Sequence, residues 1–349
     1  MTQTADLGFG IIGSGMIADY HALAINDAKG ARLVGVAGRN ATTGAGLAEK
    51  HGAPFHTTDI EALVSRDDIQ VICIATPSGA HLEPALAAIR AGKHLVIEKP
   101  LEITVERVDE LLAAAKKAGV IVAPIFQARF GQSAQLIKAA LDAGRFGRLV
   151  LASAYVKWYR SPDYYQGWKG TLALDGGGAT MNQAIHGLDL LQWFAGMPIE
   201  VFGRTTRRVH EGIEGEDTSC ASLRYADGAL GTIEASTAAY PGWARRIEIC
   251  GKNGSVSLED DTIARWDFRD SQPEDEAIRN ADGDTAMGSG SSNPNSISHQ
   301  GHLRQIQDLV NHLRDGSPLG IDAPEARKAV SLIRALYESA ESGLPVNPA

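Results

Sequence analysis

Residues 7–18 read LGFGIIGSGMIA, and this stretch decides the fold of the chain. Its first six residues form a short apolar run, after which Gly13, Gly15 and Ala18 give a GxGxxA pattern at the start of an expected helix. Gly13 permits a tight turn, Gly15 lets a pyrophosphate approach the helix N-terminus, and Ala18 allows close packing of helix on strand. The stretch predicts a dinucleotide-binding turn, with a plain strand-to-helix turn as the alternative. The residues expected around the cofactor here are Gly13, Ser14, Gly15, Met16 and Ile17.

The first 125 residues alternate between strand-like and helix-like patterns. Short apolar runs, typical of strands buried on both faces of a parallel sheet, occupy residues 31–37, 71–75, 94–97 and 120–125. Amphipathic stretches such as 83–91 and 105–118 separate them. The alternation predicts an α/β fold with an N-terminal doubly wound parallel sheet, which is an NAD(P)-binding Rossmann domain over residues 1–125.

The pattern changes in residues 126–349, which we expect to form a second domain. A helix is predicted over 132–144, followed by segments that alternate with period two: 149–158, 200–209, 218–225, 229–236, 246–250 and 255–259. Turn pairs such as Asp227-Gly228 and Asn253-Gly254 separate them. These segments predict an antiparallel sheet with one exposed face, on which either a second subunit or helices could pack. Helices over 302–313 and 324–342 close the chain.

Bulk composition excludes several classes of protein. A chain of 349 residues is too long for one ordinary core, and its net charge of −9 argues against nucleic acid or an anionic membrane as the main partner. No apolar run approaches the roughly 20 residues of a membrane span, and the N-terminus has no signal-peptide pattern. The three cysteines are widely spaced, with Cys73 in an apolar run, which fits a reducing cytoplasm.

The choice between NAD and NADP depends on the end of the second expected strand. NAD-preferring sites usually place an acidic residue there, but this chain reads VAGRN over residues 36–40, with Gly38 in the expected acidic position. Without a carboxylate the repulsion of a 2′-phosphate is lost, and Arg39 could bind that phosphate. Arg39 could equally lie in solvent and stack on adenine. We expect NAD(P) as cofactor, with NADP slightly favoured.

Two further motifs follow strands at the edge where parallel sheets bind their ligands. The sequence Glu98-Lys99-Pro100 follows the strand expected at 94–97, and Thr76-Pro77-Ser78 follows the one at 71–75. The residues expected to contact the cofactor at this edge are Gly38, Arg39, Thr76, Pro77, His81, Glu98 and Lys99.

Three features together carry a resemblance to a known family: the GxGxxA turn, Glu98-Lys99-Pro100, and the later Gly176-Gly177-Gly178…His186…Asp189. The chain resembles the glucose-fructose oxidoreductase/inositol dehydrogenase (Gfo/Idh/MocA) family. The resemblance covers essentially the whole chain. It implies a Rossmann domain, a C-terminal α/β domain with a large, mostly antiparallel sheet, and NAD(P)-linked chemistry on sugars, cyclitols and related polyols. It also implies that Lys99 and His186 are catalytic. Asn182 stands where an acidic residue is frequent in the family.

The chemistry of these residues agrees with those roles. Asn182 and His186 are one helical turn apart and share a face, and Asn182 can orient a hydroxyl without accepting its proton. His186 is suited to act as general base, while Lys99 can stabilise a developing alkoxide; the two roles could be exchanged. The alternative for His186 is a core histidine. Asp189 could orient His186 or begin a polar helix face, and His210 is expected at the surface.

Substrate contacts are expected from two segments. The stretch FQARF at 126–130 offers Gln127 and Arg129, although Arg129 could instead form a structural salt bridge. Residues 157–160 and 164–169 form an aromatic, basic flap that could stack on a sugar ring or pack an interdomain interface. A polar segment at 271–298 could act as a lid. The residues expected to bind substrate are Lys99, Gln127, Arg129, Trp158, Arg160, Tyr164, Trp168, Asn182 and His186.

The sequence therefore predicts an NAD(P)-dependent oxidoreductase that moves a hydride to or from a secondary alcohol carbon of a sugar, cyclitol or sugar derivative. The alternatives are a glycosidase that oxidises its substrate transiently with tightly bound NAD, a uronate or nucleotide-sugar 3-dehydrogenase whose substrate carboxylate meets Arg160 or Arg129, and a non-catalytic dinucleotide sensor. The partners expected are a small-molecule substrate and further copies of the chain in a homodimer or homotetramer. No metal is expected.

Overall fold

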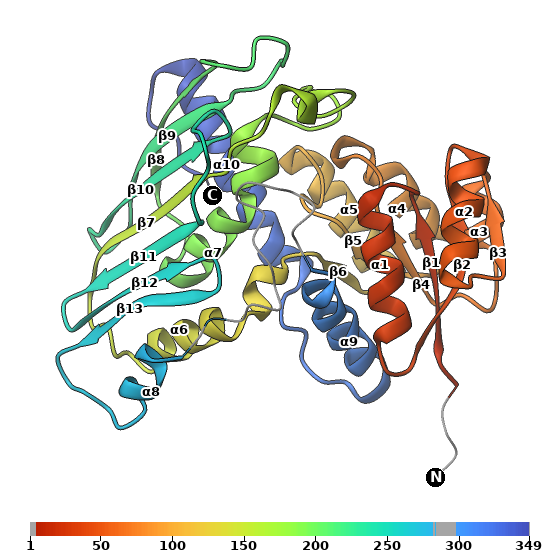
Figure 1. Cartoon of the computed structure of the whole chain (residues 1–349), viewed down its shortest axis with the longest axis horizontal. Helices are drawn as coiled ribbons and strands as arrows, with labels where there is room; N and C mark the ends of the chain where they lie inside the picture. The colour runs from red at the N-terminus through yellow and green to blue at the C-terminus, as the bar shows by residue number, and fades with distance from the viewer. Residues whose placement is uncertain (1–4, 282, 284–297, 349) are drawn as a thin grey trace. The chain divides into compact units, whose positions relative to one another are not determined.

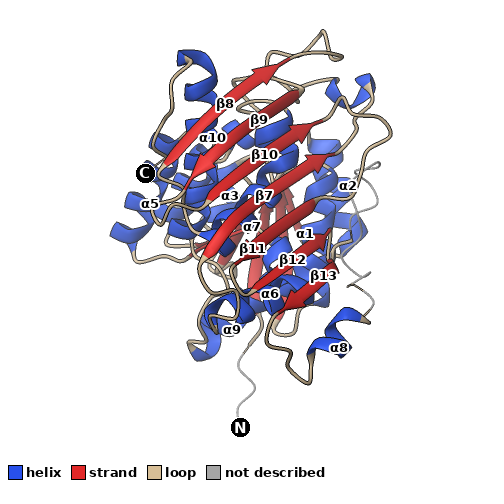
Figure 2. Ribbon diagram, turned by 90° about the vertical axis from the view of Figure 1, so that its left-hand side faces the viewer, coloured by secondary structure: helices blue, strands red, loops and turns tan. Residues whose placement is uncertain are grey.

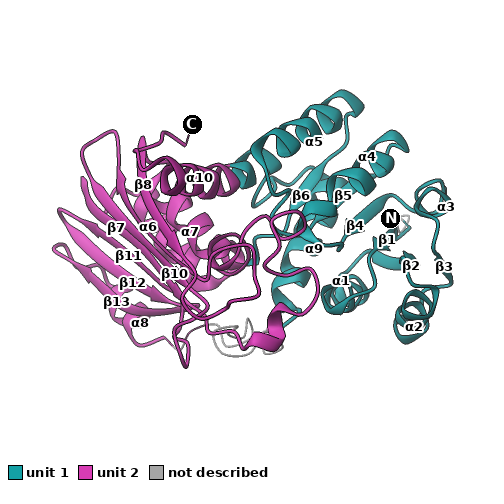
Figure 3. Cartoon of the chain, turned by 90° about the horizontal axis from the view of Figure 1, so that it is seen from above, with its two compact units in different colours: residues 1–127, 298–327 teal, residues 128–297, 328–349 magenta. Residues whose placement is uncertain are grey.

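The computed structural model describes residues 5–281, 283 and 298–348, which divide into two compact units (Figure 3). The first unit comprises Met1–Gln127 and Ser298–Arg327, and the second comprises Ala128–Ile297 and Lys328–Ala349. Residues 298–327, which the order of the sequence placed with the second domain, thus pack within the first unit. The greater part of the expected lid at 271–298 lies outside the described residues.

The first unit is built on a fully parallel sheet of six strands (Figure 1). In spatial order the strands are β3 (Phe55–Thr57), β2 (Ala31–Ala37), β1 (Leu7–Ile12), β4 (Val71–Ile74), β5 (His94–Ile97) and β6 (Val122–Pro124). The order reverses beside β1, so the carboxyl ends of β1 and β4 flank the crevice where open α/β sheets bind their ligands. The expected doubly wound parallel sheet is confirmed.

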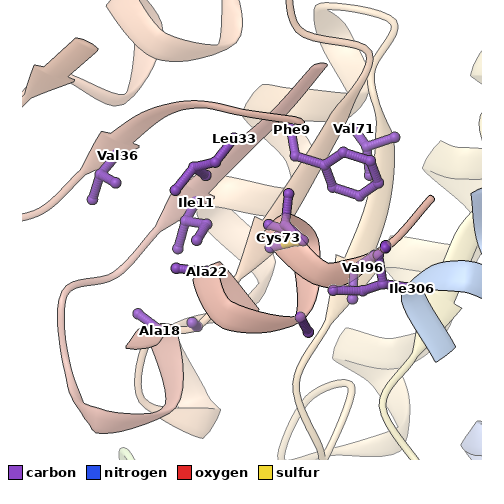
Figure 4. Close-up of a cluster of buried hydrophobic side chains, with 14 of the residues drawn as sticks. Phe9, Ile11, Ala18, Ala22, Leu33, Val36, Val71, Cys73, Val96 and Ile306 are labelled. Atoms are coloured by element: carbon purple, nitrogen blue, oxygen red, sulfur yellow. The ribbon is translucent and has the colours of Figure 1, made fainter. Parts of the chain in front are cut away.

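Helices pack on this sheet through small and aliphatic side chains. They are α1 (Met16–Asp27), α2 (Ala41–His51), α3 (Ile60–Val64), α4 (Leu82–Arg90), α5 (Val105–Ala118) and α9 (Gln300–Asp315). Phe9, Cys73 and Val96 of the sheet share one buried cluster with Ala22 of α1 and Ile306 of α9 (Figure 4). A helix from the C-terminal part of the chain therefore completes the core of the first unit.

The second unit contains a sheet of seven strands in which only β7 and β10 are parallel neighbours. In spatial order the strands are β13 (Thr262–Phe268), β12 (Gly254–Glu259), β11 (Arg246–Gly251), β7 (Leu149–Lys157), β10 (Leu230–Ser236), β9 (Thr218–Arg224) and β8 (Glu200–Thr206). The expected mostly antiparallel sheet is confirmed. Strand β13 was not predicted from the sequence, because the turn before it contains Asp260 at a positive φ of 48° instead of a glycine.

One face of the second sheet is covered by helices. The helices of this part of the chain are α6 (Gln132–Asp142), α7 (Ile185–Ala195), α8 (Asp275–Arg279) and α10 (Ala323–Ser342). Ala154 and Ile249 are buried under α7, which packs on β7 and β11. On the opposite face Leu151 and Leu230 are exposed, and Figure 2 shows no helix of the described residues in front of the strands. The exposed face expected from the period-two pattern is therefore present.

A buried ion pair fixes α7. The Arg129 guanidinium donates two hydrogen bonds to Asp189, with Nε–Oδ2 and Nη2–Oδ1 distances of 2.8 and 2.7 Å, and both side chains are almost fully buried. Arg129 lies in a 3₁₀ turn at Gln127–Phe130, and its guanidinium also stacks on the Trp193 ring at 5.0 Å. The structure thus gives Arg129 the salt-bridge role that the sequence left open beside a substrate contact. Asp189 is likewise held by Arg129, three residues after His186 on the same helix.

We expect Arg129→Met to destabilise the protein strongly, because it leaves the Asp189 carboxylate buried without its partner. Such a loss typically costs about 3–5 kcal/mol of unfolding free energy. The double variant Arg129→Met/Asp189→Leu should recover much of that loss, since it removes both charges. Chemical denaturation would measure each variant, with Arg224→Ala of the exposed Arg224–Glu200 pair as the matched control, for which little change is expected. A single variant as stable as the control would show that the pair contributes nothing.

Candidate active site

The turn between β1 and α1 has the backbone that a dinucleotide site requires. Gly13 adopts a φ of +126°, and a Cβ at this position would lie 2.4 Å from the carbonyl oxygen of Ala75. Only glycine fits this approach of β1 to the end of β4. Gly15 caps α1, and a Cβ built on it would meet nothing within 4 Å. The helix N-terminus is thus open beside Gly15, where its N–H groups and dipole favour an anion such as a pyrophosphate.

The end of β2 carries a glycine that lies close to the Ser14 side chain. Gly38 is buried, and a Cβ on it would lie 2.9 Å from Ser14 Oγ, which is itself hydrogen-bonded to Thr43 Oγ1 at 2.8 Å. A side chain at position 38 would therefore require the Ser14 side chain to shift. Arg39 is exposed, immediately before Asn40 caps α2. The geometry is compatible with Arg39 contacting the adenosine end of a dinucleotide.

His81 ties the ends of β4 and β5 together. Its ring is buried, with Nδ1 2.9 Å from the carbonyl oxygen of Pro100 and Nε2 3.0 Å from that of Thr76. The Thr76 hydroxyl in turn donates to the carbonyl oxygen of Ala80 at 2.8 Å. These contacts fix the Thr76-Pro77 turn at the carboxyl edge of the sheet. His81 therefore positions this edge through its hydrogen bonds to main-chain carbonyl groups.

Glu98 is directed into the first unit, away from solvent. Its Oε1 accepts hydrogen bonds from His21 Nε2 at 3.0 Å and His302 Nε2 at 2.9 Å, and its Oε2 accepts one from the main-chain N–H of Lys99 at 3.2 Å. Burial raises the pKa of the Glu98 carboxyl, but the two histidine hydrogen bonds outweigh burial and hold the pKa well below its ordinary value. The carboxylate is therefore ionised at physiological pH and holds the backbone from which Lys99 projects.

In the second unit the glycine run 176–178 leads into a π-helical segment, Ala179–Ala184, directly before α7. The buried Glu216 carboxylate accepts hydrogen bonds from the main-chain N–H groups of Gly178 at 3.0 Å and Thr180 at 2.7 Å, and from the Tyr337 hydroxyl at 3.1 Å. Burial raises the pKa of Glu216, although these donors lower it. Glu216 thus supplies partners for N–H groups that a helix leaves unpaired at its start. Single-turn π segments of this kind are frequent at functional sites.

Asn182 lies in the π segment with its amide orientation fixed. Its Nδ2 donates to Asp175, and its Oδ1 accepts from the Tyr164 hydroxyl at 3.3 Å and from Gln183 Nε2 at 2.9 Å. Burial raises the pKa of Tyr164 to about 12, so the phenol remains a neutral donor. The other Asp175 oxygen accepts the main-chain N–H of Gly170 at 2.7 Å. A buried carboxylate therefore lies beside the residue that replaces the family's frequent acid.

His186 is the second residue of α7 and is buried. It follows Asn182 by four residues across the junction of the π segment and the α-helix, which keeps both on the part of the chain ordered by Glu216. Lys99 belongs to the first unit, and Asn182 and His186 belong to the second. The convergence of these three side chains on one substrate remains a prediction.

The aromatic flap is partly a structural network. Arg160 is buried and donates to the carbonyl oxygen of Tyr159 at 2.8 Å and to Gln183 Oε1 at 2.7 Å, and its guanidinium lies over the rings of Trp158 and Tyr164. Trp158 is itself buried, whereas Tyr164 and Trp168 are half-buried. Of the four flap residues expected to bind substrate, Tyr164 and Trp168 are therefore the two with a side chain still reachable from solvent.

The structure also places His210 and Gln127. His210 is buried and not at the surface as expected, because its ring packs 4.7 Å from that of Tyr165 and its Nε2 lies 3.2 Å from the carbonyl oxygen of Thr237. Gln127 is half-buried at the end of the first unit, with a buried Oε1 that has no hydrogen-bond partner among the described residues. That oxygen is able to accept a hydrogen bond from a ligand.

Sequence reasoning missed the residues that orient the expected site. Five side chains form hydrogen bonds to a residue or main-chain group of the site, yet none stands in a recognisable motif. They are His21, Asp175, Glu216, His302 and Tyr337. The one available signal was His21, which follows the GxGxxA turn inside an otherwise apolar helix face. Within the described residues, no helix has both the length and the hydropathy needed to cross a bilayer.

Comparison with known proteins assigns both units. Residues 7–126 match the oxidoreductase family with an NAD-binding Rossmann fold (GFO/IDH/MocA), and residues 134–257 match the GFO/IDH/MocA C-terminal domain. The chain is 28% identical to inositol 2-dehydrogenase of Rhizobium meliloti, over 72% of this chain and 75% of that protein. It is 32% identical to 1,5-anhydro-D-fructose reductase of Ensifer adhaerens, but that alignment spans only 53% of this chain and 55% of the reductase.

A solved structure extends the match to the whole chain. The WlbA dehydrogenase from Bordetella pertussis, determined in complex with NADH and UDP-GlcNAcA, superposes with a TM-score of 0.90 at 30% identity and covers 99% of both chains. The agreement includes the parallel NAD-binding sheet and the second, mostly antiparallel sheet. The chain therefore belongs to the GFO/IDH/MocA family of NAD-binding oxidoreductases.

Proposed function

We propose that this oxidoreductase interconverts a secondary alcohol and a ketone on a sugar, cyclitol or sugar derivative. The observation that carries the proposal is the presence, in one chain, of the open Gly15 turn, Lys99 at the carboxyl edge of β5, and Asn182 and His186 on the ordered π/α junction. The inositol, anhydrofructose and UDP-GlcNAcA relatives named above all act on or bind sugar-like molecules, which supports this substrate class.

The reaction needs one hydride and one proton to leave the same alcohol. A nicotinamide bound at the carboxyl edge of the parallel sheet supplies the hydride acceptor. His186 takes the hydroxyl proton as general base, Lys99 hydrogen-bonds the same oxygen and stabilises its developing negative charge, and Asn182 orients the hydroxyl. Lys99 and His186 could exchange roles, because a desolvated lysine beside a positive ring can titrate near neutrality. In the reducing direction the same groups return the proton to the ketone oxygen.

A nucleotide sugar or uronate is the second candidate substrate, and the WlbA relative favours it. Its carboxylate would need a cation. The Asp189 pairing removes Arg129 from that role, and Arg160 is buried among Tyr159, Gln183 and the aromatic rings. Trp168 and Tyr164 are better placed to stack on a sugar ring. The transient-oxidation glycosidase remains the alternative reaction, distinguished by turnover without net change in NAD(P)H absorbance. Catalytic loss in the variants below would exclude a non-catalytic sensor.

The preferred cofactor, the assembly and the location are further proposals. NAD(H) binding follows from the family, and Gly38 with the exposed Arg39 supports acceptance of NADP as well. The uncovered sheet face with Leu151 and Leu230 supports a homodimer or homotetramer, which sedimentation at micromolar concentration would reject if only a monomer were found. The wide spacing of the cysteines, with Cys73 buried, supports a cytoplasmic location.

Gly15→Trp should abolish dinucleotide binding, because an indole at this position fills the open space that the pyrophosphate would occupy. Isothermal titration with NADH and NADPH would measure it, with exposed Gly46, whose Cβ would also meet nothing within 4 Å, mutated to Ala as the control. Arg39→Ala should weaken NADPH more than NADH. Undiminished binding to the tryptophan variant would remove the assignment of this turn, and equal losses for Arg39→Ala would show that Arg39 does not bind the 2′-phosphate.

Lys99→Met and His186→Ala should lose turnover while retaining the dinucleotide. Removal of a positioned proton-transfer group typically lowers the rate by about a hundredfold to ten-thousandfold. Asn182→Ala should cost less, because its amide only orients the hydroxyl. The measurement is kcat on whichever compound is turned over in a screen of sugars, inositols, uronates and nucleotide sugars with both cofactors. Near-native kcat in both Lys99→Met and His186→Ala would show that the reaction uses another site.

Asn182→Asp should impair the enzyme, even though an acid is frequent at this position in the family. The new carboxylate would lie against the buried Asp175, and two like charges in contact cannot both be ionised at low cost. We expect lower kcat and a lower melting temperature for Asn182→Asp. The exchanged pair Asp175→Asn/Asn182→Asp should recover part of both. If Asn182→Asp alone were as active and stable as the native enzyme, the Asp175 contact would not control this position.

A further inference from the structure

Three buried titratable side chains from distant parts of the chain meet inside the first unit. His21 comes from α1 and Glu98 follows β5, while His302, 204 residues after Glu98, comes from α9. Each is at least 95% buried, and the two imidazole rings contact edge to face with centroids 5.1 Å apart. No step of the proposed reaction uses either histidine. Burial of three such groups together is costly unless their hydrogen bonds compensate, so the cluster needs an explanation.

The hydrogen-bond directions in this cluster are fixed by the carboxylate. An ionised carboxylate only accepts, so both Nε2 atoms donate to Glu98 Oε1. The second oxygen, Oε2, accepts the main-chain N–H of Lys99. The main-chain N–H of Glu98 is paired with the carbonyl oxygen of Ile74 at 3.1 Å. On the other side of the same turn, His81 holds the carbonyl oxygen of Pro100. The backbone of residues 98–100 is thus held from two sides by buried side chains.

The same three ligand atoms could also surround a divalent cation, since they all lie within 4.8 Å of one another. The surroundings of the histidines argue against this. A metal-bound histidine nearly always donates its second ring N–H to a carboxylate, a carbonyl or water. Nδ1 of His21 and Nδ1 of His302 are both buried without a hydrogen-bond partner in the described part of the chain. With both protons on Nε2, the direct hydrogen bonds to Glu98 account for the cluster without an ion.

We propose that His21 and His302 are positioning residues for Lys99: together they orient the Glu98 carboxylate, which holds the main chain of Lys99 at the carboxyl edge of β5. The proposal rests on the proposed function, in which Lys99 meets the substrate oxygen. Loss of one histidine donor would leave the carboxylate buried with fewer partners, which favours its rotation or protonation and loosens its bond to the Lys99 N–H. By this route α9, far from Lys99 in sequence, supports the candidate catalytic edge.

The test compares two substitutions at His302 in the full-length enzyme. His302→Leu removes the donor, whereas His302→Gln retains an amide N–H that can reach the carboxylate. We expect His302→Leu to lower kcat by about tenfold to a hundredfold, the cost of slightly misplacing a reacting group, with little change in KM or in NADH affinity. His302→Gln should restore most of kcat. The matched control for damage to α9 is His312→Leu on the same helix, since His312 Nδ1 hydrogen-bonds the carbonyl oxygen of Ser317 and lies outside the cluster.

A second readout does not require turnover. The rate at which an amine-selective reagent labels Lys99, followed by mass spectrometry, should change in His302→Leu and return toward the native rate in His302→Gln. Native kcat and labelling in His302→Leu would overturn the proposal, as would equal impairment in the leucine and glutamine variants at matched melting temperatures. One equivalent of bound divalent metal in the native enzyme, lost in His302→Leu, would replace it with a metal site. A native enzyme without turnover on any compound screened would reject the proposed function but leave the labelling comparison valid.

Discussion

Four buried carboxylates, each satisfied by donors from elsewhere in its own unit, determine the backbone around the candidate site. An isolated ionised carboxylate in a protein interior is so costly that its partners must be present for the chain to fold. Glu98 is paired with two histidines and holds Lys99, while Asp189 is paired with Arg129 and holds α7. Glu216 holds the start of the π segment, and Asp175 holds Asn182. The glycine turns and sheet edges give the site its place, and these carboxylate hydrogen bonds give its residues their orientation.

The departure from the family that the resemblance implies at position 182 has a structural counterpart. The Asp175 carboxylate, which precedes the glycine run, accepts a hydrogen bond from the Asn182 amide, so that a negative charge lies beside this position. Tyr164 and Gln183 occupy the amide oxygen of Asn182. An asparagine in such a network has one allowed orientation, which suits a residue that aligns a hydroxyl without competing for its proton.

The sequence predicted the strands and turns that depend on local patterns of residues. The runs at 7–12, 31–37 and 94–97 coincide with β1, β2 and β5, because strands buried on both faces must be continuously apolar. The hairpin turns at 227–228 and 253–254 were visible because glycine marks them. Strand β13 was missed because Asp260 makes its turn without glycine, and the burial of His210 was missed because its partners are distant in sequence. The carboxylate pairs were invisible for the same reason: Arg129 and Asp189 are separated by 60 residues.

The place of α9 has a consequence for how the protein is made. Ile306, Leu309 and Val310 belong to the core cluster that also contains Phe9 and Cys73. A ribosome that has finished β6 must still add every residue up to 310 before these side chains exist. At a synthesis rate of about 5–20 residues per second, the nascent Rossmann sheet waits roughly ten to forty seconds with part of its apolar surface uncovered. The first unit therefore cannot complete its core before residues 128–297, the greater part of the second unit, have been synthesised.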